Sequence, residues 1–486
     1  MSKKAIEGLK PELIWEQFYN LSQVPRPSKK EEKIRGHVKN FAKEHGLKFK
    51  EDAVGNIVIK VPAKQGFEKS PTIVLQGHLD MVCEMNKGTK HDFDNDPIKL
   101  IRQDEWIKAD GTTLGADNGI GVAAGMAIAL DKDAEHGPLE LLCTVDEETG
   151  LTGANALKTG FIKGKTLLNL DSEEDGTFYV GCAGGVDTVG VLKIKKEKIK
   201  KDHLPFEITI SGLKGGHSGL DILNGRANAI KVLALILERI SKLNLRIGSI
   251  SGGSKRNAIP REAEAVILLN EADKNTAKKI IDTCWHELKN EYKVNDPELK
   301  VSFKKLDSFS GEAFTEKFTA KIVHTLLALP HGVVSMSSEI PDLVDTSTNL
   351  ATILEEKGLL KIGTSQRSSI ESAKNNIAAF VKSVFKLARA KEIIIGDGYP
   401  GWQPNLESVA LSKSKKVYFE MYGRDPKVKA IHAGLECGIL GNKFKGLDML
   451  SFGPTIHGAH SPDEKVHIPT VDKFYSLLKG VLKALR

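Results

Sequence analysis

The stretch Gln76-Gly77-His78-Leu79-Asp80-Met81-Val82 follows an apolar run, Thr72-Ile73-Val74-Leu75, that predicts a buried β-strand. Side chains alternate along a strand, so His78 and Asp80 point the same way while Leu79 points into the packing. Open α/β sheets place their ligands at the carboxyl ends of their strands. The stretch therefore predicts an α/β sheet with polar residues at its functional edge. Taken alone, a histidine at a strand end is more often a hydrogen-bonded structural residue than a metal ligand.

Three more apolar segments lead into acidic or histidine side chains. They are Leu139 to Val145 before Asp146-Glu147-Glu148-Thr149-Gly150, Thr166 to Leu170 before Asp171, and Met449 to Phe452 before Gly458-Ala459-His460-Ser461. A solvated turn would explain any one of them. Neighbouring carboxylates after a buried strand are costly, however, unless cations neutralise them. Because four separate strands would have to end this way by accident, the pattern indicates that their polar ends share one site.

A glycine-dense loop, Ala109 to Gly121, opens onto an Ala-rich helix, Val122 to Leu130. Glycines let the backbone approach a ligand or a sheet closely. The loop lacks the G-x-G-x-x-G and G-K-[ST] patterns, so it gives little support to phosphate binding. Asp117 lies just before the helix, where it is either an N-cap or another member of the shared site.

The composition is that of an ordinary globular chain of two or three domains. Of its 486 residues 40% are hydrophobic and 27% charged, and the net charge is +7. Lysine patches without interleaved aromatic residues indicate solvated surface, so no nucleic-acid partner is expected. The longest apolar stretch, Val232 to Ile240, is too short and too charged to span a bilayer, and neither a membrane partner nor a signal peptide is expected. Five separated cysteines without a C-x-x-C pair indicate reduced thiols and a cytoplasmic protein.

Segment 185–397 differs in pattern from the segments that flank it. Its predicted elements alternate as strand, helix, two strands, helix and strand, which is the order of a ferredoxin-like βαββαβ unit. They are Phe206 to Ile210, Arg226 to Leu243, Leu245 to Ile250, Glu262 to Leu269, Thr276 to Tyr292 and Leu299 to Lys304. A second series between Thr315 and Arg389 doubles this unit. The sequence thus predicts an α+β insertion, 185–397, that divides an α/β domain into segments 1–184 and 398–486.

Five candidate metal ligands stand at or near the predicted strand ends: His78, Asp117, Glu148, Asp171 and His460. Two imidazoles and three carboxylates without cysteine suit a pair of divalent ions, zinc first, with manganese or cobalt as alternatives. If Asp117 bridges the ions, each gains one histidine, one further carboxylate and a share of Asp117, which leaves it unsaturated. Such a pair can hold a shared water, lower its pKa and polarise a carbonyl.

Two further carboxylates have roles beside these ligands. Glu147 is adjacent to a ligand and can take the proton from the shared water as a general base. Asp80, two residues from His78, can accept the other ring N–H and fix the imidazole. We therefore place both among the candidate catalytic residues.

Together these motifs resemble the di-zinc aminoacylase/carboxypeptidase superfamily of metallopeptidases. Its sequence blocks are matched in order by Gly77 to Asp80, Gly115 to Gly119, Asp146 to Gly150, Leu170 to Glu174 and Gly458 to Ser461. The stretches Asp117 to Gly121 and His432 to Gly438, with the large insertion, resemble the aminoacyl-histidine dipeptidases, cytosolic enzymes that cleave Xaa-His dipeptides. The resemblance implies an α/β fold, a di-zinc aminopeptidase/carboxypeptidase-like catalytic domain with an inserted α+β ferredoxin-like lid. Asp171 in place of a glutamate favours the dipeptidase branches.

The resemblance also assigns residues of the lid. His217, in Gly215-Gly216-His217-Ser218-Gly219, matches the motif whose histidine steadies the oxyanion of the tetrahedral intermediate. Asn257 and Arg367 are candidates for binding the peptide carboxylate, with an ordinary surface arginine as the alternative for Arg367. A homodimer through the lid domain is expected by analogy.

The implied reaction is metal-dependent hydrolysis of dipeptides, above all Xaa-His (carnosine-like) dipeptides, with Glu147 deprotonating the metal-bridged water. One alternative on the same metal pair is an N-acyl amino-acid deacylase, a carboxypeptidase-like enzyme or a broader di- or tripeptidase. Another is a non-catalytic metal- or peptide-binding relative, against which the presence of Glu147 argues.

Overall fold

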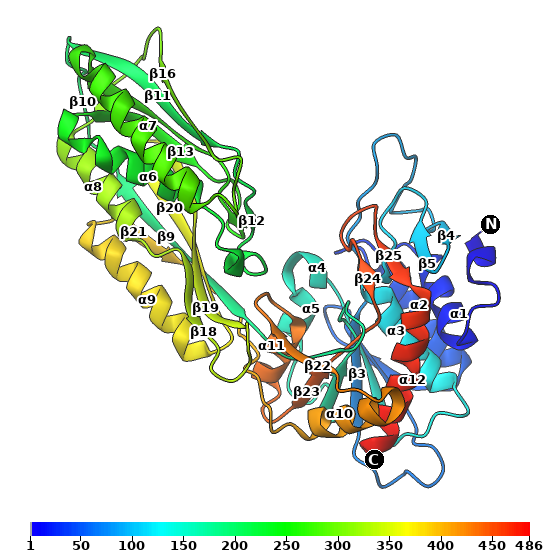
Figure 1. Cartoon of the computed structure of the whole chain (residues 1–486). Coiled ribbons are helices and arrows are strands. Elements are labelled where there is room, and N and C mark those ends of the chain that lie inside the picture. Colours follow the sequence, from blue (N-terminus) through cyan, green and yellow to red (C-terminus); the bar gives the residue numbers. More distant parts are fainter. Residues whose placement is uncertain (1) are drawn as a thin grey trace. The chain divides into compact units, whose positions relative to one another are not determined.

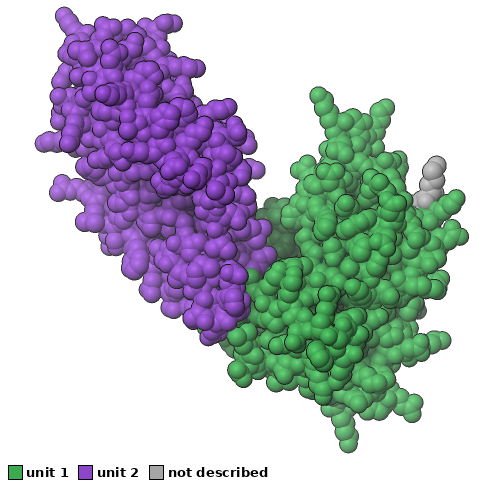
Figure 2. Space-filling view, viewed as in Figure 1, with its two compact units in different colours: residues 1–181, 402–430, 435–486 green, residues 182–401, 431–434 purple. Residues whose placement is uncertain are grey.

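The computed structural model describes residues 2–486 and divides into two compact units (Figure 1, Figure 2). Unit 1 comprises Met1–Gly181, Trp402–Ala430 and Leu435–Arg486, and unit 2 comprises Cys182–Gly401 and Ile431–Gly434. The sequence predicts divisions at 184/185 and 397/398, close to those in the structure, but it does not predict the short return to unit 2 at Ile431–Gly434. Among residues 2–486, no helix has both the length and the apolar character needed to cross a membrane.

Unit 1 is built on an eight-stranded mixed sheet in the order β1-β2-β6-β3-β7-β23-β8-β22. The strands are β1 (Lys48–Glu51), β2 (Ile57–Val61), β3 (Ile73–His78), β6 (Leu139–Thr144), β7 (Thr166–Asn169), β8 (Thr177–Cys182), β22 (Lys427–Ile431) and β23 (Asp448–Ser451). β6, β3, β7 and β23 are parallel neighbours, so their carboxyl ends meet at one edge. Every residue of β3 and β6 is buried, as expected of central parallel strands.

Unit 1 also contains helices, some of which pack on this sheet. They are α1 (Glu12–Ser22), α2 (Glu32–Glu44), α3 (Ala116–Leu130), α4 (Glu147–Gly150), α5 (Thr152–Ala156), α10 (Val409–Tyr422), α11 (Glu436–Lys443) and α12 (Ile468–Ala484). α3 packs on β3 and on α1, and α10 packs on β23 and on α12. Gly121 of α3 lets the helix backbone approach the chain at Leu170 closely. A Cβ atom at this position would lie 2.3 Å from the carbonyl oxygen of Leu170.

A smaller sheet of unit 1 carries the loop with His460. Its order is β24-β25-β5-β4, with β24 (Ile456–His457), β25 (Lys465–His467), β5 (Trp106–Ala109) and β4 (Leu100–Gln103). β24 and β25 pair in antiparallel fashion, so residues 458–464 form the connection between them. His460 thus reaches the site from a hairpin and not from the main sheet.

Unit 2 is a nine-stranded antiparallel sheet with helices over one face (Figure 1). Its first half contains β11 (His203–Ser211), α6 (Ala229–Arg239), β13 (Arg246–Gly252), β15 (Ala263–Asn270), α7 (Lys274–Glu291) and β16 (Lys300–Lys305). Their sheet order, β16-β11-β15-β13, is that of the predicted ferredoxin-like unit. α6 packs on β11 and β15 and, with α7, buries an apolar core that includes Phe206, Ile230 and Ile281.

The second half of unit 2 repeats the same arrangement. It contains β9 (Gly184–Lys193), α8 (Glu316–Ala328), β19 (Val344–Glu356), β20 (Leu359–Ser368), α9 (Glu371–Leu387) and β21 (Glu392–Ile395), with β18 (Gly332–Met336) added beside β19. Its strand order is β19-β20-β9-β21, and β13 joins β19 where Gly252 pairs with Ile353. The insertion is therefore doubled, and its two halves form one continuous sheet.

Candidate metal centre

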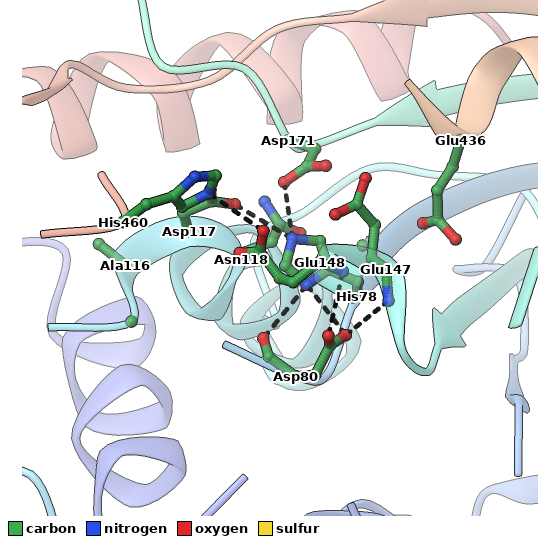
Figure 3. Close-up of polar contacts among 12 residues, drawn as sticks. His78, Asp80, Ala116, Asp117, Asn118, Glu147, Glu148, Asp171, Glu436 and His460 are labelled. Atoms are coloured by element: carbon green, nitrogen blue, oxygen red, sulfur yellow. Dashed lines mark hydrogen bonds and ion pairs between the residues drawn. The ribbon is translucent and has the colours of Figure 1, made fainter. Parts of the chain in front are cut away.

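His78 is the last residue of β3, and its two ring nitrogens face different carboxylates (Figure 3). Nε2 lies 3.1 Å from Oδ1 of Asp117 and 3.4 Å from Oδ1 of Asp171. Nδ1 lies 3.4 Å from Oδ1 of Asp80. The side chain is only 1% exposed, so the ring is held in place with Nε2 directed at the candidate ligands.

Asp117 places one carboxylate oxygen toward each of the two candidate histidines. Its Oδ1 faces His78, and its Oδ2 lies 3.1 Å from Nε2 of His460. The same nitrogen of His460 lies 3.1 Å from Oε2 of Glu148. Both carboxylate oxygens of Asp117 thus face histidines instead of the backbone N–H groups that a helix cap would bind, which argues against the helix-cap alternative.

These contacts define two groups of donor atoms. Within each group, all donor atoms lie within 4.8 Å of one another. We call His78, Asp117 and Asp171 the first donor set, and Asp117, Glu148 and His460 the second donor set. Asp117 belongs to both. Oε1 of Glu148 is buried without a hydrogen-bond partner, and Oδ1 of Asp171 has only the 3.4 Å contact with His78, which is costly unless a cation occupies the space. The arrangement therefore fits two divalent ions that share one carboxylate.

The pKa values around the two donor sets show how closely the negative charges are packed. Burial, with the charge of Asp117, raises the pKa of Asp171 well above its ordinary value. Hydrogen bonds to Asp117 and Glu148 raise the pKa of His460 to about 11. Burial lowers the pKa of His78, but the neighbouring carboxylates outweigh it and leave the value well above 6.5. Without metal, the raised pKa values favour protonation of these residues, which partly neutralises the negative charge of the site. Divalent ions would displace these protons on binding.

Glu147 lies three residues after the buried end of β6 and begins the short helix α4. A carboxylate oxygen of Glu147 lies within 4.8 Å of donor atoms of His78 and Glu148. Burial raises its pKa well above the ordinary value, and the charges of Asp171 and Glu436 add to the effect. A carboxyl group beside two ligands with a raised pKa has the properties of a general base.

Comparisons with known proteins match the whole chain. A family model described as a peptidase dimerisation domain, from the M20 peptidases, matches residues 208–296. The cytosol non-specific dipeptidase of Escherichia coli K12 is 40% identical over 483 residues, which cover 99% of each chain. The chain belongs to the M20 dipeptidase family. The aminoacylhistidine dipeptidase of Vibrio alginolyticus has a similar structure, with 39% identity and a TM-score of 0.92 over 100% of this chain and 99% of that one.

A more distant solved structure agrees in fold alone. A tripeptidase from Staphylococcus aureus is 17% identical, with a TM-score of 0.57 over 98% of this chain and 99% of that one. The predicted family and the predicted fold class, an M20 peptidase with an inserted lid domain, are thus confirmed. Unit 1 is the part of this M20 dipeptidase that carries the donor sets, and unit 2 contains the segment matched by the dimerisation model.

Glu436 is a residue of this M20 dipeptidase whose position sequence reasoning missed. It begins α11, is 1% exposed, and its Oε2 accepts hydrogen bonds from Nε2 of Gln76 at 2.6 Å and Oγ1 of Thr144 at 2.7 Å. Its Oε1 has no hydrogen-bond partner, and burial raises its pKa to about 7. Figure 3 shows its carboxyl on the side of the site where Glu147 lies. The sequence signal that could have identified Glu436 is its charge, because the other residues of Gly434 to Gly438 are small or apolar.

The polar side chain of Gln76 extends a row of hydrogen bonds across the main sheet. Its Oε1 accepts from Nδ2 of Asn169 at 2.5 Å, and Oδ1 of Asn169 accepts from Oγ of Ser451 at 2.5 Å. Ser451 in turn lies 2.6 Å from Oγ of Ser172, beside Asp171. Buried polar groups of this kind are stable only when each is paired, so the row holds the ends of β3, β7 and β23 in one arrangement.

The predicted lid residues belong to unit 2. His217 lies on β12 (Gly216–His217), and its Nδ1 accepts the backbone N–H groups of Gly219 and Leu220 at 3.3 and 3.0 Å. Burial, with the charge of Arg367, lowers the pKa of His217 to about 4. The imidazole is therefore neutral at pH 7 and carries its proton on Nε2, which makes it an N–H donor rather than a cation.

Arg367 is a buried residue of β20, only 6% exposed, so the surface-arginine alternative is wrong. Its Nη1 donates to the hydroxyl of Tyr399 at 2.7 Å, and its Nε donates to Oγ of Ser218 at 3.4 Å. Arg367, Tyr399 and the exposed Asn257 line a cavity of about 550 Å³ in unit 2. A guanidinium and an amide that face one cavity are suited to a carboxylate ligand.

Proposed function

We propose that the chain hydrolyses the peptide bond of dipeptides, with Xaa-His dipeptides as a preferred class. The observation that carries the proposal is the pair of donor sets that share Asp117, with Glu147 beside them. Two divalent ions, zinc in the first instance and manganese or cobalt as alternatives, would be held by His78, Asp171, Glu148 and His460, with Asp117 between them. When bound, they would lower the pKa of a water and polarise the substrate carbonyl.

The residues of the chain have separate tasks in this reaction. Glu147 takes a proton from the attacking water and returns it to the leaving amine, for which its raised pKa is suited. Asp80 orients the imidazole of His78 and holds the backbone of the turn that carries Glu147. His217, through Nε2–H, donates to the oxyanion of the tetrahedral intermediate.

We assign Asn257 and Arg367 to the substrate carboxylate. Arg367 is held by Tyr399 and Ser218, so its guanidinium is preorganised and loses little freedom on binding. A free C-terminal carboxylate is present on every dipeptide, so this contact selects short substrates without selecting a side chain. The names of the relatives are consistent with a broad dipeptide range and with a preference for histidine-containing dipeptides. One is called a non-specific dipeptidase and the other an aminoacylhistidine dipeptidase.

A substrate panel on the metal-loaded protein tests the proposal. It compares β-alanyl-histidine and alanyl-histidine with dipeptides that lack histidine, with tripeptides and with N-acetyl amino acids. We expect the Xaa-His dipeptides to have the highest kcat/KM and the N-acetyl amino acids the lowest. Faster cleavage of N-acetyl amino acids would instead favour the deacylase alternative. No turnover of any substrate by protein that contains two ions would favour a binding function.

The assembly and the location of the protein are part of the proposal. We infer a homodimer through the lid domain, supported by the match of residues 208–296 to the dimerisation family. β13 is already paired with β19, so among the described strands the edges of the nine-stranded sheet are β16, β21 and the short strand β18. Light scattering after gel filtration would give twice the chain mass for a dimer. A cytoplasmic location is tested by cell fractionation.

A further inference from the structure

Glu464 ends the loop that carries His460, and its carboxylate is 2% exposed. It accepts hydrogen bonds from four consecutive backbone N–H groups of the loop that carries Asp117. These are the N–H groups of Leu114 and Gly115, 2.7 and 2.9 Å from Oε2, and of Ala116 and Asp117, 2.7 and 3.3 Å from Oε1. Hydrogen bonds to an ionised acceptor are about twice as strong as neutral ones. One side chain therefore ties the Asp117 loop to the His460 loop.

Arg26 holds the same backbone from the other side. Its Nη2 donates to the carbonyl oxygen of Gly115, whose N–H is bound by Glu464. Its Nη1 donates to the carbonyl oxygens of Leu79 and Asp80 at 2.9 and 3.0 Å, just after His78. Gly115 has φ +71°, and a Cβ atom there would lie 2.5 Å from Nη2 of Arg26, so only glycine fits.

Neither Glu464 nor Arg26 belongs to a donor set. Both are nevertheless charged and almost fully buried, and Arg26 is only 4% exposed. Buried charges are costly unless they are well paired, so such residues usually serve a specific purpose. The contacts indicate that Glu464 and Arg26 hold three segments in place: the residues after His78, the Asp117 loop and the His460 loop.

We propose that Glu464 is a positioning residue of the metal centre: it fixes the carboxylate of Asp117 relative to His460 and thereby sets the affinity for the ion of the second donor set. This inference rests on the proposed metal-dependent function. The second donor set takes Asp117 and His460 from the two loops that Glu464 joins. The first donor set shares Asp117 but takes its other two members, His78 and Asp171, from the ends of β3 and β7, which the sheet holds independently of Glu464.

A substitution of Glu464 should therefore weaken binding of the second ion much more than binding of the first, because two of the three members of the first donor set do not depend on Glu464. In Glu464→Gln, the amide nitrogen replaces one acceptor oxygen and faces backbone N–H groups, so two of the four hydrogen bonds are lost. Loss of a residue that orients a ligand usually costs about 10–100-fold in metal affinity. A purely structural role would instead lower the stability of the metal-free protein and weaken both ions alike.

Glu140→Gln is the matched control. Glu140 is 3% exposed on β6, and its Oε2 accepts the backbone N–H groups of Lys163 and Gly164 at 2.6 and 3.1 Å. It pairs with Val74, near the opposite end of β3 from His78. The same substitution there removes a buried carboxylate that binds backbone amides without touching the loops of Asp117 and His460.

The test is a titration of the metal-free full-length chain with Zn²⁺ in competition with a chromophoric chelator. We expect two tight ions for the unsubstituted chain and for Glu140→Gln. Glu464→Gln should bind one ion within threefold of the original affinity and the other at least tenfold more weakly. In a His460→Ala background, Glu464→Gln should add less than threefold, because both substitutions act on the same ion.

Three outcomes would contradict the inference. Unchanged affinity for both ions in Glu464→Gln, or equal weakening of both, would leave Glu464 without a positioning role. Fewer than two ions in the unsubstituted chain would overturn the proposed metal centre, and this inference with it. If Glu464→Gln does not fold, Glu464→Asp replaces it: the shorter carboxylate should show the same selective loss, and equal affinities at both ions would again overturn the proposal.

Discussion

Asp80 and Glu147 are joined by a 3.0 Å hydrogen bond from the backbone N–H of Glu147 to Oδ1 of Asp80. The same oxygen lies 3.4 Å from Nδ1 of His78, and Oδ2 accepts the N–H of Glu148 at 3.2 Å. Although burial alone would raise the pKa of Asp80, hydrogen bonding to His78 holds it well below its ordinary value. A single ionised carboxylate thus fixes a candidate ligand and the turn that carries the candidate base.

We expect Asp80→Asn to lower kcat/KM by about 10–100-fold, because the neutral amide holds the imidazole less strongly and its nitrogen cannot accept the N–H of Glu148 in place of Oδ2. The measurement is steady-state kinetics on alanyl-histidine together with the metal content of the purified protein. Ser28→Ala is the control, since it removes only the 2.8 Å hydrogen bond from Oγ of Ser28 to Oδ2. Equal activity of Asp80→Asn and Ser28→Ala would show that Asp80 does not orient the site.

Glu147→Gln should retain both ions and lose about 10²–10⁴-fold in kcat, because the amide cannot accept a proton. KM should change little, since Glu147 is not assigned to substrate binding. Single-turnover kinetics and metal analysis of the same preparation separate the two effects. A metal-loaded Glu147→Gln protein with normal turnover would remove Glu147 from the mechanism.

Glu436→Gln should raise the melting temperature of the metal-free protein and lower the gain that metal binding brings. The amide oxygen can still accept from Gln76 and Thr144, so the substitution removes charge and keeps the hydrogen bonds. Replacing an uncompensated buried charge usually stabilises a fold, but it also removes attraction for cations. Thermal unfolding with and without Zn²⁺ measures both the melting temperature of the metal-free protein and its increase on metal binding. A lower melting temperature in the metal-free variant would mean that Glu436 is neutral or needed for packing.

The stability of unit 2 should fall as the pH falls below about 6.5. Burial lowers the pKa of His432 to about 3, with the charge of Arg367 adding to the effect, and its Nε2 lies 2.7 Å from Oγ of Ser347. An unfolded histidine titrates near 6.5, so between these values the unfolded chain binds the proton first and the free energy of unfolding decreases. The contribution is at most about 1.4 kcal/mol per pH unit.

Urea unfolding at pH 7, 6 and 5 measures this slope. His432→Gln should give a shallower dependence than the unsubstituted chain, because glutamine does not titrate. His331→Gln is an informative companion, since burial also lowers the pKa of His331, to about 4. Parallel slopes for the unsubstituted chain and His432→Gln would show that His432 is not buried as a neutral ring.

Much of the fold follows from local sequence pattern. The apolar runs before His78, Glu147 and Asp171 are buried parallel strands, and the order of elements in the insertion is the one that alternating strand and helix patterns predict. The five candidate ligands meet because parallel strands end at one edge and because a hairpin delivers His460. Their assignment as ligands remains a prediction that metal titration tests.

Other features depend on contacts between residues far apart in the chain, which no local pattern encodes. Glu464 and Arg26 form hydrogen bonds with backbone groups of the Asp117 loop. Every residue has such groups, so the residue types in the loop do not predict these contacts. Glu436 lies 360 residues from Gln76, its hydrogen-bond partner. The neutral state of His217 depends on burial and on Arg367, so its residue type alone did not reveal it.

The interleaving of the two units restricts how the protein can be shortened. Unit 1 consists of three segments and unit 2 of two, because Ile431–Gly434 groups with unit 2 while Glu436 belongs to unit 1. A chain in which Gly181 is joined directly to Trp402 would still contain His432 but would lack Ser347, which binds its ring. Excision of the lid would therefore leave His432 without its hydrogen-bond partner, and a soluble fragment that retains only the metal centre would also need residues 431–434 replaced by a polar turn.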